Sequence, residues 1–329
     1  MGKKLRWGIL GVAKINRKLV PAFTHARSAD LKGIASRSLA RAQEAARAAH
    51  IPKSFGSYEE LLDDPDIDAV YVPLPNTLHG EWSCRAADKG KHVLCEKPLA
   101  PTAAEAARIV EHCRQKNVKL MDGFMWPHHV RTARLRGLID SGTLGTLRHV
   151  HGCFTFRMDS LELDNIRLQA ELGGGSLLDV GCYPVYGIRW ALGEEPVEVF
   201  ARAEFRHEVD VAMTGQLWFA SGATASFDCG FTMPLRQHLE IVGSEAVLRI
   251  DEMWVPSKKT SFSVQRNEEL PDLTVIENED QIAHMLDDFG AAVLEDKAVT
   301  PAPEEAVKTL RVLEALTRSA RAGTVIRLD

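Results

Sequence analysis

The chain has 329 residues, 45% hydrophobic and 26% charged, a composition that excludes an intrinsically disordered protein and suits two globular domains. Its 45 acidic and 40 basic residues are spread without blocks, and this pattern and the net charge of −5 exclude a broad cationic surface for nucleic acid or an anionic membrane. No apolar run approaches the roughly 20 residues that span a bilayer. The first residues lack the apolar stretch of a signal peptide, and the six cysteines contain no CxxC pair. We therefore expect a cytoplasmic protein with buried free thiols and no metal site.

The first 120 residues alternate short apolar runs with longer helical patterns. Strands are predicted at residues 5–10, 31–35, 69–73, 92–95 and 118–121, and helices from the first glycine turn to about 26 and at 38–49, 58–62, 78–89 and 102–116. Thr102, followed by Glu105, has the spacing of a helix-capping box. This rhythm predicts crossover connections and a parallel sheet with helices on both faces. Ligands of such sheets bind at the carboxyl ends of the strands.

After about residue 124, the pattern changes to longer runs that partly alternate between apolar and polar residues. One helix is predicted at residues 131–140, and strands at 148–156, 197–206, 213–219, 224–230, 238–242 and 246–250. This pattern favours a mostly antiparallel sheet with one face packed and the other either open or covered by a partner. Two late helices, at 280–295 and 303–320, are expected to complete the core. We therefore predict two domains, residues 1–124 and residues 125–329.

The turn after the first strand, from Gly8 to Asn16, is the first segment with a chemical signature. A glycine that ends a strand and opens a helix lets backbone N–H groups approach a pyrophosphate. Counted from Gly11, the GxGxxG pattern is interrupted at Ala13 and Asn16. An ordinary turn is the alternative, but the position at the first strand–helix junction favours a phosphate loop. The expected cofactor contacts are Gly11, Val12, Ala13, Lys14 and Ile15.

The end of the second strand distinguishes NADP from NAD. An NAD enzyme typically has an acid there that binds the ribose hydroxyls, whereas this strand ends at Ala35 and continues with Ser36 and Arg37. Asp30 has the right spacing but precedes the strand. A hydroxyl and a guanidinium suit the 2′-phosphate of NADP, and Arg41 adds charge one turn later. The alternative is a solvated arginine, and we expect NADPH to be preferred over NADH.

Lys97 follows the fourth strand, so it is expected at the same sheet edge as the glycine turn. An ammonium group there can orient a substrate oxygen, stabilise negative charge and lower the pKa of a neighbouring acid. A surface ion pair with Glu96 is the alternative interpretation.

A second cluster is the run from Gly173 to Pro184, which contains three consecutive glycines. Such glycines permit close backbone approach or an irregular turn. Asp179 and Tyr183 are four residues apart and share one face if the segment is helical. A tyrosine near a lysine can give a proton to a ketone or take one from an alcohol. The alternative is a core tyrosine whose hydroxyl is satisfied.

With these motifs, the sequence resembles the glucose–fructose oxidoreductase/inositol dehydrogenase (Gfo/Idh/MocA) family over essentially its whole length. The glycine turn, Ser36-Arg37, the run at 72–79, Glu96-Lys97-Pro98 and the GGGxxxDxGxY run occur in the family's order and spacing. The chain is most similar to the NADP branch, with glucose–fructose oxidoreductase, sugar 3-ketoreductases, 1,5-anhydrofructose reductase, xylose dehydrogenase and dihydrodiol dehydrogenase.

The resemblance implies an α/β Rossmann domain followed by an α+β domain with a large open-faced, mostly antiparallel sheet that is often used for dimerisation. It implies that Lys97 is the catalytic lysine, often with a cis bond to Pro98, and that Asp179 and Tyr183 face the substrate. Arg167 matches a substrate-contact position. The further cofactor contacts implied are Pro73, Leu74, Asn76, His79 and Glu96.

We therefore predict an NADP(H)-dependent oxidoreductase that transfers a hydride to or from a sugar, cyclitol or related secondary alcohol or ketone. Tyr183 transfers the proton, Lys97 orients the oxygen and tunes the tyrosine, and Asp179 anchors a hydroxyl. We expect a homodimer or homotetramer formed through the open sheet. The alternative is a non-catalytic NADP-binding regulatory or sensor protein, since the family includes a galactose-pathway repressor; the intact Lys97 and Tyr183 argue against it.

Overall fold

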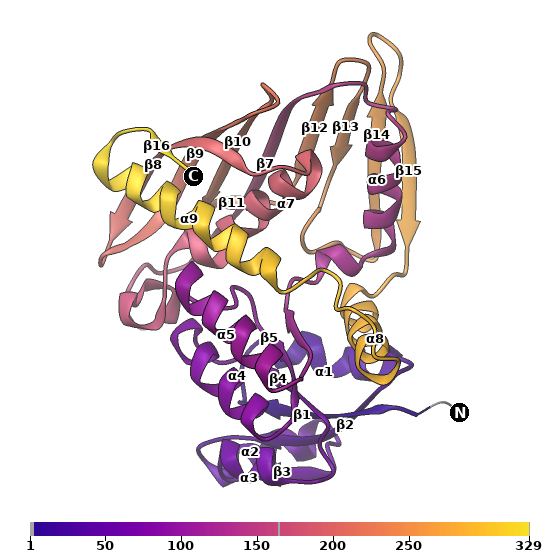
Figure 1. Cartoon of the computed structure of the whole chain (residues 1–329), viewed down its shortest axis with the longest axis vertical. Helices are drawn as coiled ribbons and strands as arrows, with labels where there is room; N and C mark the ends of the chain where they lie inside the picture. Colours follow the sequence, from indigo (N-terminus) through magenta and orange to yellow (C-terminus); the bar gives the residue numbers. More distant parts are fainter. Residues whose placement is uncertain (1–2, 164, 329) are drawn as a thin grey trace. The chain divides into compact units, whose positions relative to one another are not determined.

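The computed structural model describes residues 3–163 and 165–328, and the chain forms two compact units (Figure 1). The first unit contains the described residues up to His128 together with Asp280–Val307, and the second contains His129–Glu279 and the described residues from Lys308 onward. The single boundary that we predict near residue 124 would place residues 280–307 in the second domain. In the structure, these residues belong to the first unit.

The first unit is built on a six-stranded parallel sheet with the strand order β3-β2-β1-β4-β5-β6. This arrangement confirms the expected Rossmann fold, and its strand order reverses between β1 and β4, where such sheets bind ligands. The predicted cap is present, because Thr102 Oγ1 accepts a hydrogen bond from the Glu105 N–H at 3.2 Å. The strands are β1 Leu5–Leu10, β2 Ala29–Ala35, β3 Lys53–Phe55, β4 Ala69–Val72, β5 His92–Cys95 and β6 Leu120–Asp122. The helices are α1 Asn16–His25, α2 Leu39–Ala48, α3 Tyr58–Asp63, η1 Asn76–Leu78, α4 His79–Asp88, α5 Ala103–Gln115, η2 Trp126–His128 and α8 Gln281–Leu294.

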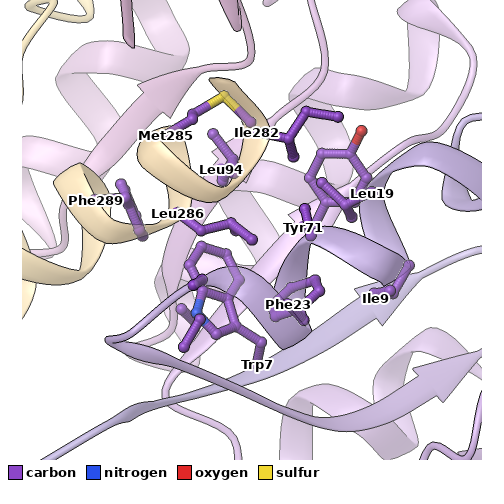
Figure 2. Packing of buried hydrophobic residues seen from close by; sticks show 14 of the residues in the cluster. Trp7, Ile9, Leu19, Phe23, Tyr71, Leu94, Ile282, Met285, Leu286 and Phe289 are labelled. Atoms are coloured by element: carbon purple, nitrogen blue, oxygen red, sulfur yellow. The ribbon is translucent and has the colours of Figure 1, made fainter. Parts of the chain in front are cut away.

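Helix α8 joins the first unit through its apolar face. The ring centroid of Trp7, in β1, lies 5.8 Å from that of Phe23 in α1 and 5.3 Å from that of Phe289 in α8 (Figure 2). Burial of apolar surface is the main favourable contribution to folding, so this cluster explains why α8 packs here although it is distant in sequence. The α8 residues in the cluster are Ile282, Ala283, Met285, Leu286 and Phe289.

The second unit contains a ten-stranded sheet in the order β15-β14-β13-β12-β7-β10-β9-β8-β16, with β11 paired to β7. Strands β7 and β10 are parallel, and the other pairs are antiparallel. The strands are β7 Leu147–Arg157, β8 Pro196–Arg206, β9 Val209–Phe219, β10 Thr224–Gly230, β11 Thr232–Arg236, β12 Leu239–Gly243, β13 Val247–Ile250, β14 Lys259–Gln265, β15 Asp272–Glu277 and β16 Ile326–Arg327. The helices are α6 Val130–Asp140, η3 Ile166–Leu168, η4 Ala170–Leu172, the π-helix η5 Leu177–Gly181, α7 Cys182–Leu192 and α9 Glu304–Ala322, whose residues from Lys308 on belong to this unit.

The two faces of this sheet differ in polarity, as the sequence predicted. On one face, a Cβ at Gly152 of β7 would lie 2.9 Å from Pro184 Cβ, so α7 packs closely on the sheet. On the other face, His149 and His151 are half-buried and lie 3.2 Å and 2.9 Å from the Ser226 hydroxyl of β10. The strand period of two explains this separation of apolar and polar side chains.

Candidate active site

The glycine turn after β1 lies at the point where the strand order reverses. Gly11 has φ +130°, a conformation that L residues rarely adopt. A Cβ at Gly11 would lie 3.2 Å from Leu74 Cδ2, which belongs to the loop after β4. The two loops at the reversal point therefore approach each other closely at this glycine.

Asn16 closes this turn where the usual pattern has a third glycine. Its side chain is buried, and Nδ2 donates a hydrogen bond to the Gly11 carbonyl oxygen at 2.8 Å. Helix α1 begins at Asn16 with no side-chain cap and no acid in its first turn, among the described residues. Its first N–H groups donate to carbonyl oxygens of the preceding turn, Asn16 to Ala13, Arg17 to Lys14 and Lys18 to Ile15. The positive dipole end of the helix is the feature that suits an anion. Of the neighbouring contacts expected from the sequence, Lys14 is exposed, and the half-buried ones are Val12, Ala13 and Ile15. These features fit the pyrophosphate of a dinucleotide.

Two guanidinium groups follow β2, as the sequence predicted. Ser36 is buried, and Arg37 and Arg41 are exposed. A Cβ at Gly11 would lie 3.8 Å from the Tyr58 hydroxyl at the start of α3. Burial raises the pKa of Tyr58, and the positive charges of Arg37 and Arg41 partly oppose that rise. Tyr58 therefore lies close both to the glycine turn and to the charges of Arg37 and Arg41. Sequence reasoning missed Tyr58 because its only signal was a short predicted helix.

Asp30 lies at the other end of β2. Its Cα is in register with Arg6, near the start of β1, and its carboxylate forms an ion pair with Lys32 at 2.6 Å. Asp30 therefore lies at the edge of the sheet opposite the glycine turn, and the interpretation that it does not bind the ribose stays a prediction.

His79 connects the loops that follow β4 and β5. Its Nε2 lies 2.8 Å from the Leu74 carbonyl oxygen and its Nδ1 lies 2.9 Å from that of Pro98. Burial lowers the pKa of His79 to about 4, although both carbonyls favour the charged ring, and the Lys97 ammonium lowers it further. The ring is fully buried and bonds both loops, and the cofactor contact that the resemblance implies stays a prediction. The other predicted residues of the first loop differ in exposure: Pro73 is buried, whereas Leu74 and Asn76 are half-buried.

Lys97 follows β5 at the same carboxyl edge. The Glu96 carboxylate beside it is held by the Tyr71 hydroxyl of β4, which donates to Oε1, and by the Lys97 backbone N–H, which donates to Oε2 at 3.2 Å. The Lys97–Pro98 peptide bond is cis, as the resemblance implies. Both Glu96 and Lys97 are half-buried, which suits groups that meet a ligand.

Asp122 is a further acid near Lys97 that sequence reasoning did not single out. It ends β6, in register with Cys95, and its Oδ1 is buried with no hydrogen-bond partner among the described atoms. Burial, followed by the charge of Glu96, raises the pKa of Asp122 well above its ordinary range, whereas the Lys97 ammonium lowers it. A carboxyl that favours its neutral form therefore neighbours the lysine.

In the second unit, the three glycines before η5 have distinct reasons to be glycine. Gly173 and Gly175 have φ values of +74° and +113°. A Cβ at Gly174 would lie 2.5 Å from the Arg167 carbonyl oxygen. The sequence offered two reasons for these glycines, a close backbone approach and an irregular turn, and both are present in the structure.

Asp179 and Arg167 are brought together in this unit. Arg167 Nε donates to Asp179 Oδ2 at 2.6 Å, and the Arg167 guanidinium lies 5.8 Å from the ring centroid of Phe156. Asp179 belongs to η5, and such single π-helical turns occur frequently at functional sites. A carboxylate and a guanidinium on one surface are groups that hydrogen-bond hydroxyls.

Tyr183 lies in the first turn of α7 and is 3% exposed. Its ring centroid is 5.1 Å from that of Phe154, in an edge-on arrangement, and 6.0 Å from that of Trp254. Aromatic packing therefore orients the phenol ring, and its part in proton transfer stays a prediction.

Two family models match the chain. Residues 5–124 match an oxidoreductase family with an NAD-binding Rossmann fold, and residues 132–249 match the Gfo/Idh/MocA C-terminal domain. The chain belongs to the Gfo/Idh/MocA family. It is accordingly an NAD(P)-dependent oxidoreductase.

Several members of the Gfo/Idh/MocA family resemble the chain over its length. A D-xylose 1-dehydrogenase (NADP(+)) from Haloferax volcanii is 36% identical over 99% of this chain and 100% of its own. The crystal structure of an aldose-aldose oxidoreductase from Caulobacter crescentus, complexed with glycerol, has a TM-score of 0.91 at 29% identity, covering 99% of this chain and 100% of that one. A 3-ketoreductase from Actinomadura kijaniata in complex with NADP and TDP-benzene has a TM-score of 0.90 at 30% identity, covering 96% and 98%.

The remaining expectations concern membranes, metals and thiols. Within the described ranges, no helix is both long and apolar enough to cross a bilayer. The described residues also contain no cluster of three His, Cys, Asp or Glu side chains that could hold a metal ion. All six cysteines are free thiols, and all but the partly exposed Cys84 are buried.

Proposed function

We propose that this protein is an NADP(H)-dependent oxidoreductase that transfers a hydride to or from a sugar, cyclitol or related secondary alcohol or ketone. The observation that carries the proposal is that Lys97 follows β5 at the carboxyl edge of the parallel sheet, the edge that also holds the Gly11 turn. A bound nicotinamide supplies or accepts the hydride. The chain's own residues hold the substrate, orient its oxygen and move the proton.

NADP, rather than NAD, is the proposed cofactor. Ser36, Arg37 and Arg41 offer a hydroxyl and two guanidinium groups after β2, and Tyr58 adds a hydroxyl beside them. Charge-assisted hydrogen bonds from guanidinium groups favour a phosphate, and a carboxylate at this place would repel it. The names of the Haloferax volcanii and Actinomadura kijaniata relatives, which include NADP, support the same choice.

Four residues are proposed to act on the substrate. Lys97 donates a hydrogen bond to the reacting oxygen and stabilises negative charge on it. Tyr183 gives the proton to a ketone or accepts it from an alcohol. Asp179 accepts a hydrogen bond from a substrate hydroxyl, and its partner Arg167 makes a further contact.

Relatives named for D-xylose and for aldoses support a sugar or polyol as substrate. A dTDP-3,4-didehydro-2,6-dideoxy-alpha-D-glucose 3-reductase from Saccharopolyspora spinosa, 32% identical over 98% of this chain and 100% of its own, supports the same substrate class.

We propose that the polar face of the ten-stranded sheet, which carries His149 and His151, is the surface through which copies of the chain form a dimer or tetramer. A reducing cytoplasm is the proposed compartment, consistent with six free thiols.

The substitution Lys97→Ala tests the proposed function. We expect turnover to fall by roughly 10²- to 10⁴-fold, with NADPH affinity, followed by nucleotide fluorescence, unchanged. Lys91→Ala is the matched control, because Lys91 precedes β5 at the opposite edge and donates to the carbonyl oxygens of Asp64 and Ile67. Unchanged turnover of Lys97→Ala would remove the lysine from the mechanism. NADPH binding by the unmodified protein without turnover of any sugar, ketosugar or dihydrodiol would favour the sensor alternative.

A further inference from the structure

The helical segment that carries Asp179 is capped by a residue from a distant strand. Ser176, at its N-cap, makes no side-chain capping bond of its own. Instead, Asp210 of β9 accepts a hydrogen bond on Oδ2 from the Leu177 N–H at 2.7 Å and another from the Ser176 hydroxyl. The first N–H groups of a helix lack intrahelical partners, and negative charge near them is favourable. A buried carboxylate thus takes the place of a local cap.

The other oxygen of Asp210 lies against the glycine triplet. A Cβ at Gly175 would lie 2.6 Å from Asp210 Oδ1, so only a glycine leaves space for the carboxylate. The Asp210 carboxylate is therefore enclosed by the last glycine on one side and the start of η5 on the other. This contact gives Gly175 a second reason to be glycine besides its positive φ.

Asp210 and its partner Ser176 are both buried. Asp210 is 9% exposed, and burial raises its pKa, whereas the bonds from Ser176 and Leu177 lower it. Ser176 Oγ also lies 3.7 Å from the Sγ of the buried Cys229. A buried carboxylate that loses its donors is strongly destabilised, so the carboxylate and the helix start cannot separate at low cost.

We propose that Asp210 is a positioning residue that sets the placement of Asp179 and Tyr183 by holding Ser176 and Leu177. Asp179 follows Leu177 by two residues in the same π-helical segment, and Tyr183 follows in the first turn of α7. A shift of the helix start along its axis would move both groups together. The inference rests on the proposed function, in which these two side chains act on the substrate.

Asp210→Asn is the primary test. Asparagine keeps the volume but replaces one acceptor oxygen with an amide N–H donor, which faces either the helix N–H groups or Gly175. A displacement of about 1 Å can lower a rate by about 10²-fold, so we expect kcat to fall roughly 10- to 100-fold. NADPH affinity should be unchanged, and the alkaline limb of the kcat–pH profile should shift as the surroundings of Tyr183 change.

Asp287→Asn is the matched control, because Asp287 of α8 makes a similar set of bonds in the first unit. Its Oδ1 accepts from the Ser28 N–H and from the Ser28 hydroxyl, both at 2.7 Å. We expect the two variants to lose similar thermal stability, and only Asp210→Asn to lose kcat. Equal kcat values and identical pH profiles for both variants would overturn the positioning role.

Ser176→Ala is the second variant, and it decides the matter if Asp210→Asn does not fold. It removes one of the two donors, and we expect kcat to fall roughly 3- to 10-fold, as for a lost hydrogen bond of about 1 kcal/mol. Wild-type kcat and pH profile in Ser176→Ala would overturn the inference.

Tyr183→Phe separates the two proposals. If Tyr183→Phe retains turnover, the proposed proton transfer by Tyr183 fails, although the oxidoreductase activity stands; if it loses turnover while Asp210→Asn keeps it, only the positioning role fails.

Discussion

The two glycine segments of this protein are stabilised by different means. In the first unit, the Gly11 turn is closed by Asn16, five residues further along the chain. In the second unit, the glycine triplet leads into a helix held by Asp210, which is 33 residues from Leu177 and lies on another strand. The first segment therefore depends on nearby sequence, and the second depends on the assembled sheet.

This difference also separates the expected effects of substitution. Changes around Gly11 should alter cofactor affinity, because they act on the loop at the reversal point of the parallel sheet. Changes around Gly175 should alter turnover, because they act on the segment that carries Asp179 and Tyr183. The following predictions test that separation, starting with the largest expected effect.

Gly175→Ala is expected to lower kcat/KM by about 100-fold, because its Cβ would displace the Asp210 carboxylate and hence the helix start. The positive φ adds about 1–3 kcal/mol of backbone strain. Turnover and thermal unfolding are the measurements. Gly222→Ala is the control, since Gly222 has φ +86° and nothing within 4 Å of its Cβ position. If Gly175→Ala loses no more turnover than Gly222→Ala, the contact with Asp210 has no functional role.

Acidification is expected to destabilise the protein through His79, whose ring contacts the loops that follow β4 and β5. The folded state holds this ring neutral with a pKa of about 4, whereas the unfolded chain binds a proton below about 6.5. The stability is therefore present above pH 6.5 and is lost as the pH falls toward 4. Between pH 7 and pH 5, the loss is about 2 kcal/mol. Urea unfolding at both pH values measures it.

His79→Gln should reduce this pH dependence, and His50→Asn, which changes an exposed histidine of the same unit, should not. Equal slopes for His79→Gln and the unmodified protein would show that another group controls acid stability.

Arg37→Ser is expected to weaken NADPH binding by roughly tenfold and to leave NADH binding unchanged, because a guanidinium contact to the 2′-phosphate is lost. Titrations with both nucleotides measure the ratio. Arg47→Ser, which changes an arginine in the last turn of α2 that has no predicted cofactor contact, should leave the ratio unaltered. A parallel loss of NADPH and NADH affinity would argue against a phosphate contact.

Asn16→Ala should have the smallest effect. It removes one buried hydrogen bond to the Gly11 carbonyl, which contributes about 1 kcal/mol, so NADPH affinity should fall about fivefold. Asn16→Gly, which restores the third glycine of the common pattern, should bind NADPH more tightly than Asn16→Ala. Turnover at saturating nucleotide should be similar in both, and a large loss of kcat would contradict the separation of the two segments.

The parallel sheet was predictable from sequence to a larger extent than the mixed sheet. Strand β4 is apolar and buried throughout, and β1 and β5 each contain only one partly buried polar residue, Arg6 and His92, so the three strands stand out from their surroundings in the sequence. Strands β14 and β15 were not predicted. Many β15 residues are exposed, including Leu273, and β15 is held as a strand by its pairing with β14.

For the candidate site, motif spacing predicted roles for Lys97, Asp179 and Tyr183, but it gave no signal for several residues that the structure places around these groups. Tyr58, Asp122 and Asp210 have no motif around them, because each lies on a different element from the groups that it neighbours. His79 was recognised as part of a motif, but its buried, supporting position required the fold.

By itself, the sequence determined a Rossmann domain with a glycine turn after its first strand and a following sheet domain, because these depend on local turns and on the period of buried side chains. Only the tertiary structure decided that α8 belongs to the first unit, where its apolar face packs in one buried cluster with Trp7 and Phe23. It also decided that a carboxylate from β9 caps the helix after the glycine triplet. The packing of α8 and the capping by Asp210 both depend on contacts between residues far apart in the chain, and a local sequence pattern cannot predict such contacts.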